Sequence, residues 1–237
     1  MYNGKLNEYI ERLPVKSIII AKNLYDKFFY NLSEAAFIKN LERLVKKELL
    51  IVIGKGVYYK PQKSFMGMMG IADNELRNYF VDGNKSGIER GYALYNKYGL
   101  TTQVSKKMQL YSNKIVFNKQ VIKNATVEKF NFKYNYKLAF TVEYLEVLEN
   151  YRSIEDLNYK ALYNFCKKIA AEYDEMKLES VLKSGWYKKR TIAFLQHILN
   201  YFNVKNNLKK FLNSTSKYDY LKMESIANAA ALKRRFI

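Results

Sequence analysis

Apolar residues recur at helical spacing in the first third of the chain. The segment 3–13 predicts a helix that Pro14 ends, because four apolar residues fall on one stripe of it: Leu6, Tyr9, Ile10 and Leu13. A second, short helix is expected over about 19–28, with Ser17 as its candidate N-cap. Two short helices therefore precede the stronger pattern that begins at Ser33.

The clearest helix signal is NLSEAAFIKNLERLVKKELL. Ser33 is a favourable N-cap residue, and the Glu34 carboxylate suits the positive end of the helix dipole. One side of the helix is formed by Phe37, Leu41, Leu44, Val45 and Glu48. The other side carries Ala36, Lys39, Asn40, Arg43, Lys46 and Lys47. The segment thus predicts an amphipathic helix with a basic outer face.

Directly after this helix, LLIVIGKGVYYKP predicts a β-hairpin. Residues 49–53 and 57–60 are β-prone, and Gly54-Lys55-Gly56 makes a tight connection between them. Three helices followed by a hairpin is the order of a winged helix-turn-helix domain, so we expect one over residues 1–63. Its DNA-binding residues would be Ser33, Ala36, Lys39, Asn40, Arg43, Lys46, Lys47 and, at the tip of the wing, Lys55. The alternative is a small helical domain whose basic face is simply solvated.

The remaining residues, 64–237, predict an α+β domain that ends in a helical segment. QKSFMGMMG after Pro61 reads as a linker. Helices are expected over 73–80, 87–98 and 137–150, with Asp73 and Ser86 as candidate caps of the first two, and short strands over 106–112, 114–118 and 125–132. Further helices are expected over 157–173, 176–183, 187–202, 204–213 and 217–232. The predicted fold class of the whole chain is α+β.

The charge of the chain points to its partner. Its 237 residues include 41 Lys and Arg against 22 Asp and Glu, a formal net charge of +19. Residues 1–63 alone hold 12 basic and 6 acidic groups. Such an excess favours a polyanion, most simply nucleic acid, although a bias toward Lys, Asn, Ile and Tyr across the chain would also raise it. Apolar runs such as Ile18–Ala21 are too short for a membrane span, so a cytoplasmic protein without a membrane partner is expected.

Residues for catalysis or metal binding are sparse. His197 is the only histidine and sits in the apolar run FLQHILNYF, and Cys166 is the only cysteine. Gly54-Lys55-Gly56 is too short for a phosphate-binding loop, and SGIERG (86–91), although similar to a nucleotidyltransferase element, has no Asp-x-Asp pair after it. The acidic residues Asp174, Glu175 and Glu179 read as a solvated helix face rather than a cation site. We therefore expect no enzyme activity, no cofactor and no bound metal.

Two stretches resemble the AbiEi-type antitoxin family. LERLVKKELLIVIGKGVYYKP (41–61) is similar to the family pattern LxRLVKKGxLxxxGxGxYYxP, and Ser86-Gly87 with GYALYNKYGLTTQV (91–104) is similar to a helix ending in Gly-Leu before Ser/Thr-Thr-Gln-Val and a strand. A weaker similarity covers 188–203. The chain departs from the family at Ser105, where Pro is expected, and at Glu48, where a helix-ending Gly is usual. The family residues matched in the second stretch are Ser86, Gly91, Tyr92, Ala93, Leu94, Gly99, Leu100, Thr102, Gln103 and Val104.

Physical chemistry favours a structural role for this second stretch. Gly99 can take the positive φ that ends a helix, Leu100 can fold back onto its apolar side, and Gln103 can bond to backbone where a strand begins. A junction between helix and sheet is therefore favoured over a catalytic loop.

The resemblance implies two roles for the chain. One is repression of its own promoter through the winged helix on double-stranded DNA, where inverted repeats would allow a homodimer. The other is neutralisation of a cognate nucleotidyltransferase-like toxin, directly or indirectly, in a two-gene toxin–antitoxin system for phage defence by abortive infection. The main alternative is a transcription regulator without a toxin, whose C-terminal domain dimerises or senses a ligand. An enzyme acting on nucleic acid is disfavoured by the missing acidic and histidine constellations.

Overall fold

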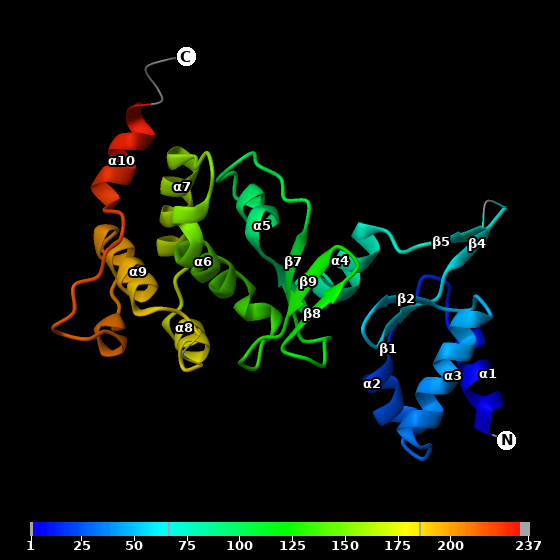
Figure 1. The fold of residues 1–237 in the computed structure, drawn as a ribbon. Coiled ribbons are helices and arrows are strands. Elements are labelled where there is room, and N and C mark those ends of the chain that lie inside the picture. The colour runs from blue at the N-terminus through cyan, green and yellow to red at the C-terminus, as the bar shows by residue number, and fades with distance from the viewer. Residues whose placement is uncertain (1, 66, 185, 233–237) are drawn as a thin grey trace. The chain divides into compact units, whose positions relative to one another are not determined.

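A computed structural model describes residues 2–65, 67–184 and 186–232. It confirms a mixed α+β fold in which helices accompany a curled sheet (Figure 1). The chain divides into two units, the first comprising Met1–Gly87 and Lys107–Phe130 and the second Ile88–Lys106 and Asn131–Ile237. The boundary predicted between residues 63 and 64 stays a prediction, and it lies inside the first unit.

The first unit begins with helices and a hairpin and continues into a sheet. Its helices are α1 (Tyr2–Arg12), α2 (Ala21–Leu24), α3 (Glu34–Lys46) and α4 (Asp73–Val81), with a wider π turn over Tyr25–Phe29. Its strands are β1 (Ile18–Ile20), β2 (Ile51–Gly54), β3 (Val57–Tyr59), β4 (Gln62–Ser64), β5 (Gly67–Met69), β7 (Met108–Ser112), β8 (Lys119–Ile122) and β9 (Ala125–Glu128). The main sheet has the order β1-β3-β2-β8-β9-β7 and continues to β6 (Gly87–Glu89), and β4 and β5 form a separate hairpin.

Two apolar clusters hold the first unit together. One lies under the N-terminal helices and includes Leu6, Ile10, Phe37, Leu41, Leu44 and Leu50. The other lies between the sheet and α4 and includes Val57, Tyr59, Leu76, Phe80, Ile122 and Val127. The second cluster joins residues from both sides of position 63, because β2 pairs with β8 at Gly54 and Ile122. The N-terminal hairpin is therefore built into the larger sheet.

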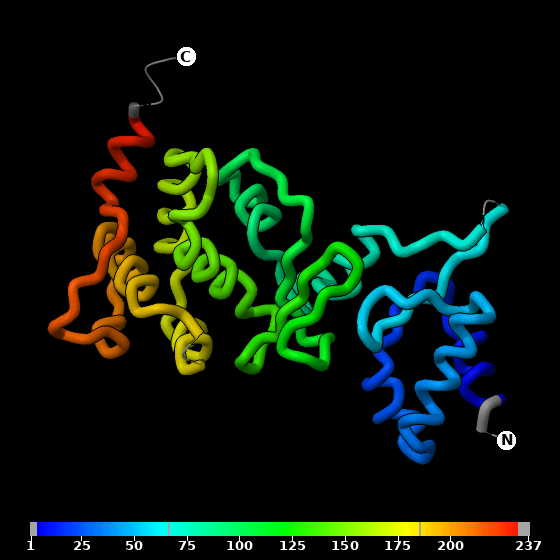
Figure 2. The backbone as a smooth tube through the Cα atoms, viewed as in Figure 1, coloured from blue at the N-terminus to red at the C-terminus, as the bar shows by residue number. Residues whose placement is uncertain are grey.

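Helices dominate the second unit. They are α5 (Gly91–Lys97), α6 (Ala139–Asn150), α7 (Tyr159–Ala171), α8 (Glu175–Leu182), α9 (Lys189–Tyr201) and α10 (Met223–Leu232). Figure 2 traces the backbone through them and through the irregular segment between α9 and α10. Leu138, just before α6, and Val142, Leu145 and Leu148 on α6 are buried. Among the described residues, no helix has the length and apolar character needed to cross a bilayer.

The sequence was wrong about several elements in the first unit. The helix expected over 19–28 begins with a strand instead, because the β-branched run Ile18–Ile20 pairs with β3. Ser17 does not cap a helix, since its hydroxyl donates to the carbonyl of Pro14 at 2.7 Å. The predicted strand 114–118 is a turn, and the predicted linker over 62–70 contains the β4–β5 hairpin.

Other elements differ in their extent. The helix expected over 87–98 starts only at Gly91, and strand β6 comes first, so Ser86 is not its cap. Gly87 has no room for a side chain, because a Cβ there would lie 2.1 Å from the carbonyl oxygen of Tyr111. Only a short 3-10 turn, Leu208–Phe211, forms within the helix expected over 204–213.

Glu48 takes the backbone conformation that glycine would take at the end of α3. Its φ is +57°, and its N–H donates to the carbonyl of Val45 while the N–H of Leu49 donates to Leu44. These two bonds form a Schellman cap, in which the left-handed residue is usually Gly. Glycine is the residue that this backbone conformation favours, and the cap forms here with Glu in its place.

Glu48→Gly is therefore expected to stabilise the protein by up to about 1 kcal/mol, because a residue with a Cβ is strained in the left-handed region. Thermal unfolding would measure the change, with Glu42→Gly in the middle of α3 as the control. The control is expected to destabilise by about 1 kcal/mol. Equal losses from both substitutions would show that position 48 is not strained.

Candidate nucleic-acid interface

Helix α3 is an amphipathic helix with a fixed start. The Ser33 hydroxyl accepts a hydrogen bond from the N–H of Ala36 at 3.3 Å, which confirms the predicted N-cap. Phe37, Leu41 and Leu44 are at most 1% exposed and anchor the helix to the cluster beneath it. The side chains on the opposite face are exposed: Ala36, Lys39, Arg43, Lys46 and Lys47.

The exposed cations of this face are not neutralised by nearby carboxylates. Within the part of the chain that the structure describes, Lys39, Lys46 and Lys47 form no ion pair, and Arg43 donates to the Asn40 side chain at 3.4 Å. A cluster of unpaired cations on one helix face produces a positive potential that attracts phosphate groups. We call Ala36, Lys39, Arg43, Lys46 and Lys47 the basic face of α3.

Asn40 does not belong to this face. It is 6% exposed and lies on the buried side, where its carbonyl oxygen accepts from Arg43. At 100° per residue, position 40 falls next to Phe37 and Leu44 rather than between Lys39 and Arg43. The prediction that Asn40 lies on the exposed basic side of the helix was therefore wrong, and its side chain instead supports the Arg43 guanidinium.

Lys55 lies exposed in the tight turn between β2 and β3, as predicted. Gly56 has a φ of +66°, which is the conformation that this turn requires. The side-chain amide of Gln120 donates to the Lys55 carbonyl, and the Lys55 ammonium lies 6.0 Å from the centre of the Phe117 ring. Residues 117–120 therefore support the turn from one side and leave the ammonium group at the surface.

The stretch 91–104 is a structural junction in the second unit. Gly99 has a φ of +65°, and the N–H of Leu100 donates to the Tyr95 carbonyl, so α5 ends in a Schellman cap. Leu100 is fully buried. The Leu100 carbonyl then accepts from the N–H of Asn158, which caps α7 with its side chain.

The polar residues after Leu100 complete this junction. The Thr101 hydroxyl donates to the Glu155 carbonyl at 2.7 Å, and the Gln103 side chain donates to the Asp156 carboxylate at 2.6 Å. The sequence predicted a junction to a strand with Gln103 bonded to backbone. Instead, the junction connects α5 to the start of α7, and Gln103 bonds to a side chain. Among the other matched residues, Gly91 and Leu94 are buried, Tyr92 is half-buried, and Ala93, Thr102 and Val104 are exposed.

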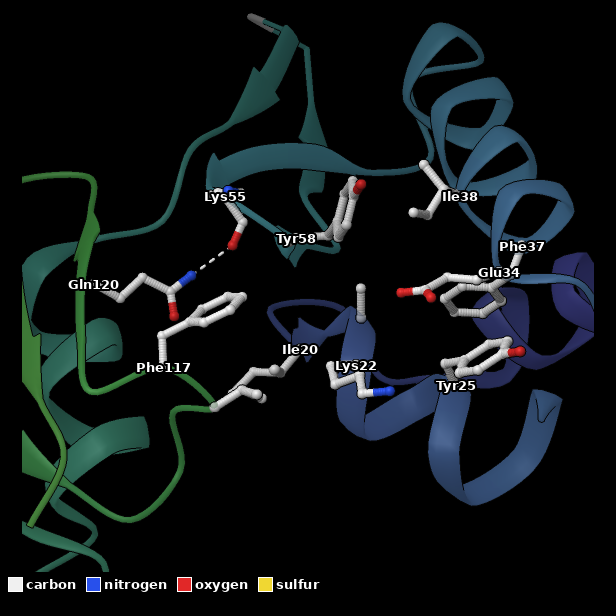
Figure 3. A pocket seen from close by; sticks show the side chains of 13 residues that line it. Ile20, Lys22, Tyr25, Glu34, Phe37, Ile38, Lys55, Tyr58, Phe117 and Gln120 are labelled. Carbon is white, nitrogen blue, oxygen red and sulfur yellow. Dashed lines mark hydrogen bonds between the residues drawn. The ribbon is translucent and has the colours of Figure 1, made fainter. Parts of the chain in front are cut away.

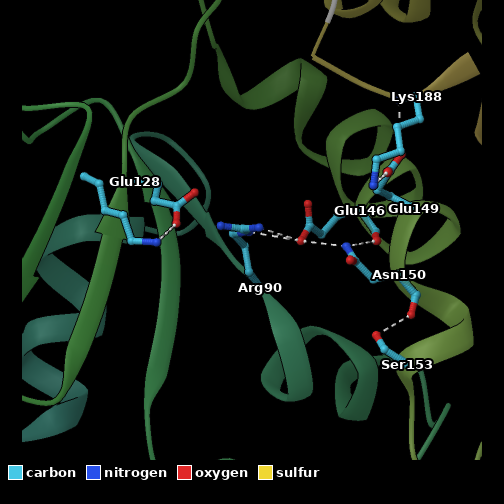
Figure 4. Close-up of polar contacts among 8 residues, drawn as sticks. Arg90, Glu128, Glu146, Glu149, Asn150, Ser153 and Lys188 are labelled. Carbon is cyan, nitrogen blue, oxygen red and sulfur yellow. Dashed lines mark hydrogen bonds and ion pairs between the residues drawn. The ribbon is translucent and has the colours of Figure 1, made fainter.

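Helix α6 carries carboxylates that the sequence did not single out. Glu143 and Glu146 are 3% and 4% exposed. The Lys97 ammonium lies 2.6 Å from Glu143, and the Tyr98 hydroxyl also donates to it. The Arg90 guanidinium donates to Glu146 at 3.0 Å, and Asn150 donates to the same oxygen at 3.2 Å (Figure 4). Since each buried carboxylate has a cation beside it, these groups clamp α5 to α6.

One turn further along α6, Glu149 makes a similar contact with the start of α9. Its carboxylate accepts from the Lys188 backbone at 3.2 Å and from the Thr191 hydroxyl, and the Lys188 ammonium lies 3.0 Å away (Figure 4). Burial raises the pKa of Glu149, but the hydrogen bonds from Thr191 and Lys188 outweigh it and hold the pKa below its ordinary value. Glutamates at 143, 146 and 149, within an otherwise apolar helix, were the sequence signal for this clamp.

The lowered pKa makes Glu149 a source of acid sensitivity. A carboxyl whose pKa is lower in the folded state stabilises the fold above its unfolded pKa of about 4.3, and loses that contribution as the pH falls through the folded value. Glu149→Gln should therefore make the free energy of unfolding fall less steeply below about pH 5 than in the wild type. Urea titrations at several pH values would measure this, with exposed Glu8→Gln as the control. A slope that Glu149→Gln leaves unchanged would contradict the assignment.

The residues considered above for catalysis or metal binding have structural roles. The imidazole of His197 accepts from the N–H of Met223 at 3.0 Å, and burial lowers the pKa of His197. Cys166 is fully buried, which raises the pKa of its thiol to about 12. Asp174 caps α8, and Glu175 and Glu179 lie beside Lys210. The described residues contain no group of three or more His, Cys, Asp or Glu side chains placed to hold a metal ion.

Comparison with known proteins identifies a family for this chain. No curated protein matches it. Among solved structures, the fold is similar to that of the Rv2827c protein from Mycobacterium tuberculosis, with 10% identity and a TM-score of 0.40 over 83% of this chain and 75% of that one. The model of a family of unknown function, DUF6088, matches residues 5–185. The chain therefore belongs to the DUF6088 family.

Proposed function

We propose that this protein is a DNA-binding repressor that forms the antitoxin half of a two-gene toxin–antitoxin system. Residues 1–63 act as a winged helix-turn-helix domain on the promoter of the protein's own operon. Helix α3 enters the major groove, and the β2–β3 turn lies along the phosphate backbone. The observation that carries this proposal is the basic face of α3, which is exposed and unpaired among the described residues.

The geometry around α3 supports this role. A recognition helix must be held rigidly while its outer face stays free, and the Ser33 cap with the buried Phe37, Leu41 and Leu44 fulfils the first condition. Arg43 is steadied by Asn40, which reduces the entropy lost when its guanidinium binds a base or a phosphate. Bidentate contact from Arg to guanine is the commonest specific contact in the major groove.

The antitoxin role is supported by the resemblance of residues 41–61 and 86–104 to AbiEi-type antitoxins. A nucleotidyltransferase-like toxin is the partner that this resemblance implies. The second unit, which holds most of the 86–104 stretch, is the proposed site of neutralisation. The experiment that tests both roles uses the full-length chain with the gene next to it.

In that experiment, the upstream region of the operon drives a reporter, and the neighbouring gene is expressed separately from an inducible promoter. The wild-type chain should repress the reporter and restore growth when the neighbouring gene is induced. The double variant K39A/R43A should lose repression and still restore growth. Repression without any toxicity from the neighbouring gene would indicate a regulator without a toxin, and the antitoxin role would then be wrong.

Lys55 offers a separate prediction about the turn between β2 and β3. Lys55→Ala should weaken binding to all duplexes by a similar factor, because a phosphate contact carries no sequence information. The slope of log affinity against log salt should fall by about one unit. Titrations of the operon's upstream duplex and of a shuffled duplex at several salt concentrations would measure both effects. A loss confined to one of the two duplexes would show that Lys55 contacts bases.

A further inference from the structure

The first unit carries an apolar arm that its own fold leaves uncovered. The hairpin β4–β5 is exposed along its whole described length, and at its tip Phe65 is 99% exposed. Met68 and Met69 on the return strand are 39% and 51% exposed. A two-stranded hairpin is marginally stable by itself in water, and exposed apolar side chains grouped on it mark an interaction site. We call residues 62–65 and 67–69 the arm.

The same unit also contains an apolar cavity of about 420 Å³. Its walls come from α2, the π turn, α3, the β2–β3 turn and residues 116–120, and aromatic rings of Tyr25, Phe37, Tyr58 and Phe117 line it. Figure 3 shows the Glu34 carboxylate and the Phe117 ring pointing toward the middle of the cavity from opposite sides. An apolar cavity of about 150 Å³ already accommodates a benzene ring, so this one has room for a phenylalanine side chain and a methionine beside it.

The cavity also offers the arm a carboxylate, because Glu34 lines it together with Lys22 and Lys55, and the Lys22 ammonium lies 2.9 Å from the Asp26 carboxylate. Lys63 lies on β4, and Phe65 follows two residues later in the turn at the tip of the arm. Within the described residues, neither Lys63 nor Glu34 forms an ion pair. A phenylalanine from the arm in the cavity would therefore bring the Lys63 ammonium near the Glu34 carboxylate, which also interacts electrostatically with Lys22.

The arm of one molecule cannot easily fill its own cavity. Gly56 lines the cavity at the start of β3, whereas the arm leaves from the other end of that strand, after Tyr59. The root of the arm is fixed, because the Lys60 side chain donates to the carbonyls of Ile10, Glu11 and Leu13 and Pro61 is buried. In Figure 1 the arm projects away from the N-terminal helices.

We propose that the arm of each molecule inserts Phe65 into the aromatic cavity of a second copy of this chain, with Lys63 against Glu34. Exchange of two arms gives a closed, two-fold symmetric dimer in which each contact occurs twice. The cavity lies on the Glu34 and Ile38 side of α3, and the basic face lies on the other side, so the dimer leaves the basic face uncovered. This inference concerns self-association and holds with or without DNA binding.

Sedimentation equilibrium of the full chain without DNA tests this proposal. The wild type should be a dimer at micromolar concentration, and Phe65→Ala should raise the dimer dissociation constant at least tenfold. Met176→Ala removes another highly exposed apolar side chain, 85% exposed on α8, and serves as the matched control, with no change expected. A wild type that stays monomeric, or one whose dimer survives Phe65→Ala, would overturn the proposal.

A charge exchange identifies the partner of the arm. Lys63→Glu and Glu34→Lys should each weaken the dimer, and the two substitutions in one chain should restore most of the lost affinity. A cross-link provides a second check, since Cys166 is buried and is the only cysteine. A mixture of Phe65→Cys and Ile38→Cys chains should form a disulfide-linked heterodimer on mild oxidation. Failure of both the rescue and the cross-link would show that something other than the arm, such as a small apolar ligand, fills the cavity.

Discussion

Replacing Lys39 and Arg43 together by alanine is expected to lower the affinity for the operon's own upstream DNA by roughly 30-fold or more, because each good base contact contributes about 1–3 kcal/mol. Both side chains are exposed on the basic face of α3 and make no contact that supports the fold beyond the bond from Arg43 to Asn40. Fluorescence anisotropy with a labelled duplex, at one fixed salt concentration, would give the two dissociation constants.

The control for this prediction removes two positive charges from a surface without a proposed DNA contact. Lys160 and Lys167 are exposed on α7, so K160A/K167A changes the net charge by the same amount. It should weaken binding only a few-fold. If the two double variants lose the same factor in DNA affinity, the loss in K39A/R43A comes from the lower net charge alone, and α3 is not a recognition helix. Circular dichroism of both variants should match that of the wild type.

Arg90→Ala is expected to destabilise the protein by about 3 kcal/mol, because it leaves Glu146 buried without its cation. The Glu146 side chain is 5% exposed, and the hydrogen bond from Asn150 remains in the variant. Urea unfolding followed by circular dichroism would measure the loss. The result bears on the clamp between α5 and α6, and hence on the junction formed by residues 91–104.

Two further variants show whether the effect comes from the buried charge. The pair between Arg152 and Asp219 is exposed, so Arg152→Ala should destabilise the protein much less than Arg90→Ala. Replacing both partners, as in Arg90→Met with Glu146→Leu, should cost less than Arg90→Ala alone, because no unpaired carboxylate is then left in the interior. A double variant less stable than the single one would indicate that Arg90 acts through packing and not through its charge.

The sequence predicted α3 and its cap because the information is local. Ser33, the first-turn Glu34 and apolar residues at helical spacing lie within one turn or two of each other. The same pattern placed Asn40 incorrectly, because a polar residue between two basic positions looks exposed until its angle around the helix is compared with that of Leu44. The hydrogen bond that its side chain accepts from Arg43 could not be predicted from the periodicity.

Contacts between segments that are distant in the sequence could not be predicted from the pattern of apolar and polar residues. Ile18–Ile20 forms a strand because β3, some forty residues later, offers an edge to it. Residues 114–118 are β-prone but form a turn, where the N–H of Lys114 donates to the Ser112 hydroxyl. The sequence analysis did not single out the carboxylates of α6, because their cations come from residues 46 and 56 positions earlier in the chain. Each of these features is decided by a contact between distant segments.

The most direct test of DNA recognition compares two duplexes of equal length and composition at physiological salt. One is the region upstream of the operon, and the other is a shuffled version of it. Specific recognition predicts that the full-length chain binds the first about a thousandfold more tightly or better, since specific and non-specific affinities of DNA-binding proteins commonly differ by that factor. Equal dissociation constants for the two duplexes would contradict the account, because a net charge of +19 attracts any DNA and only base contacts distinguish one sequence from another.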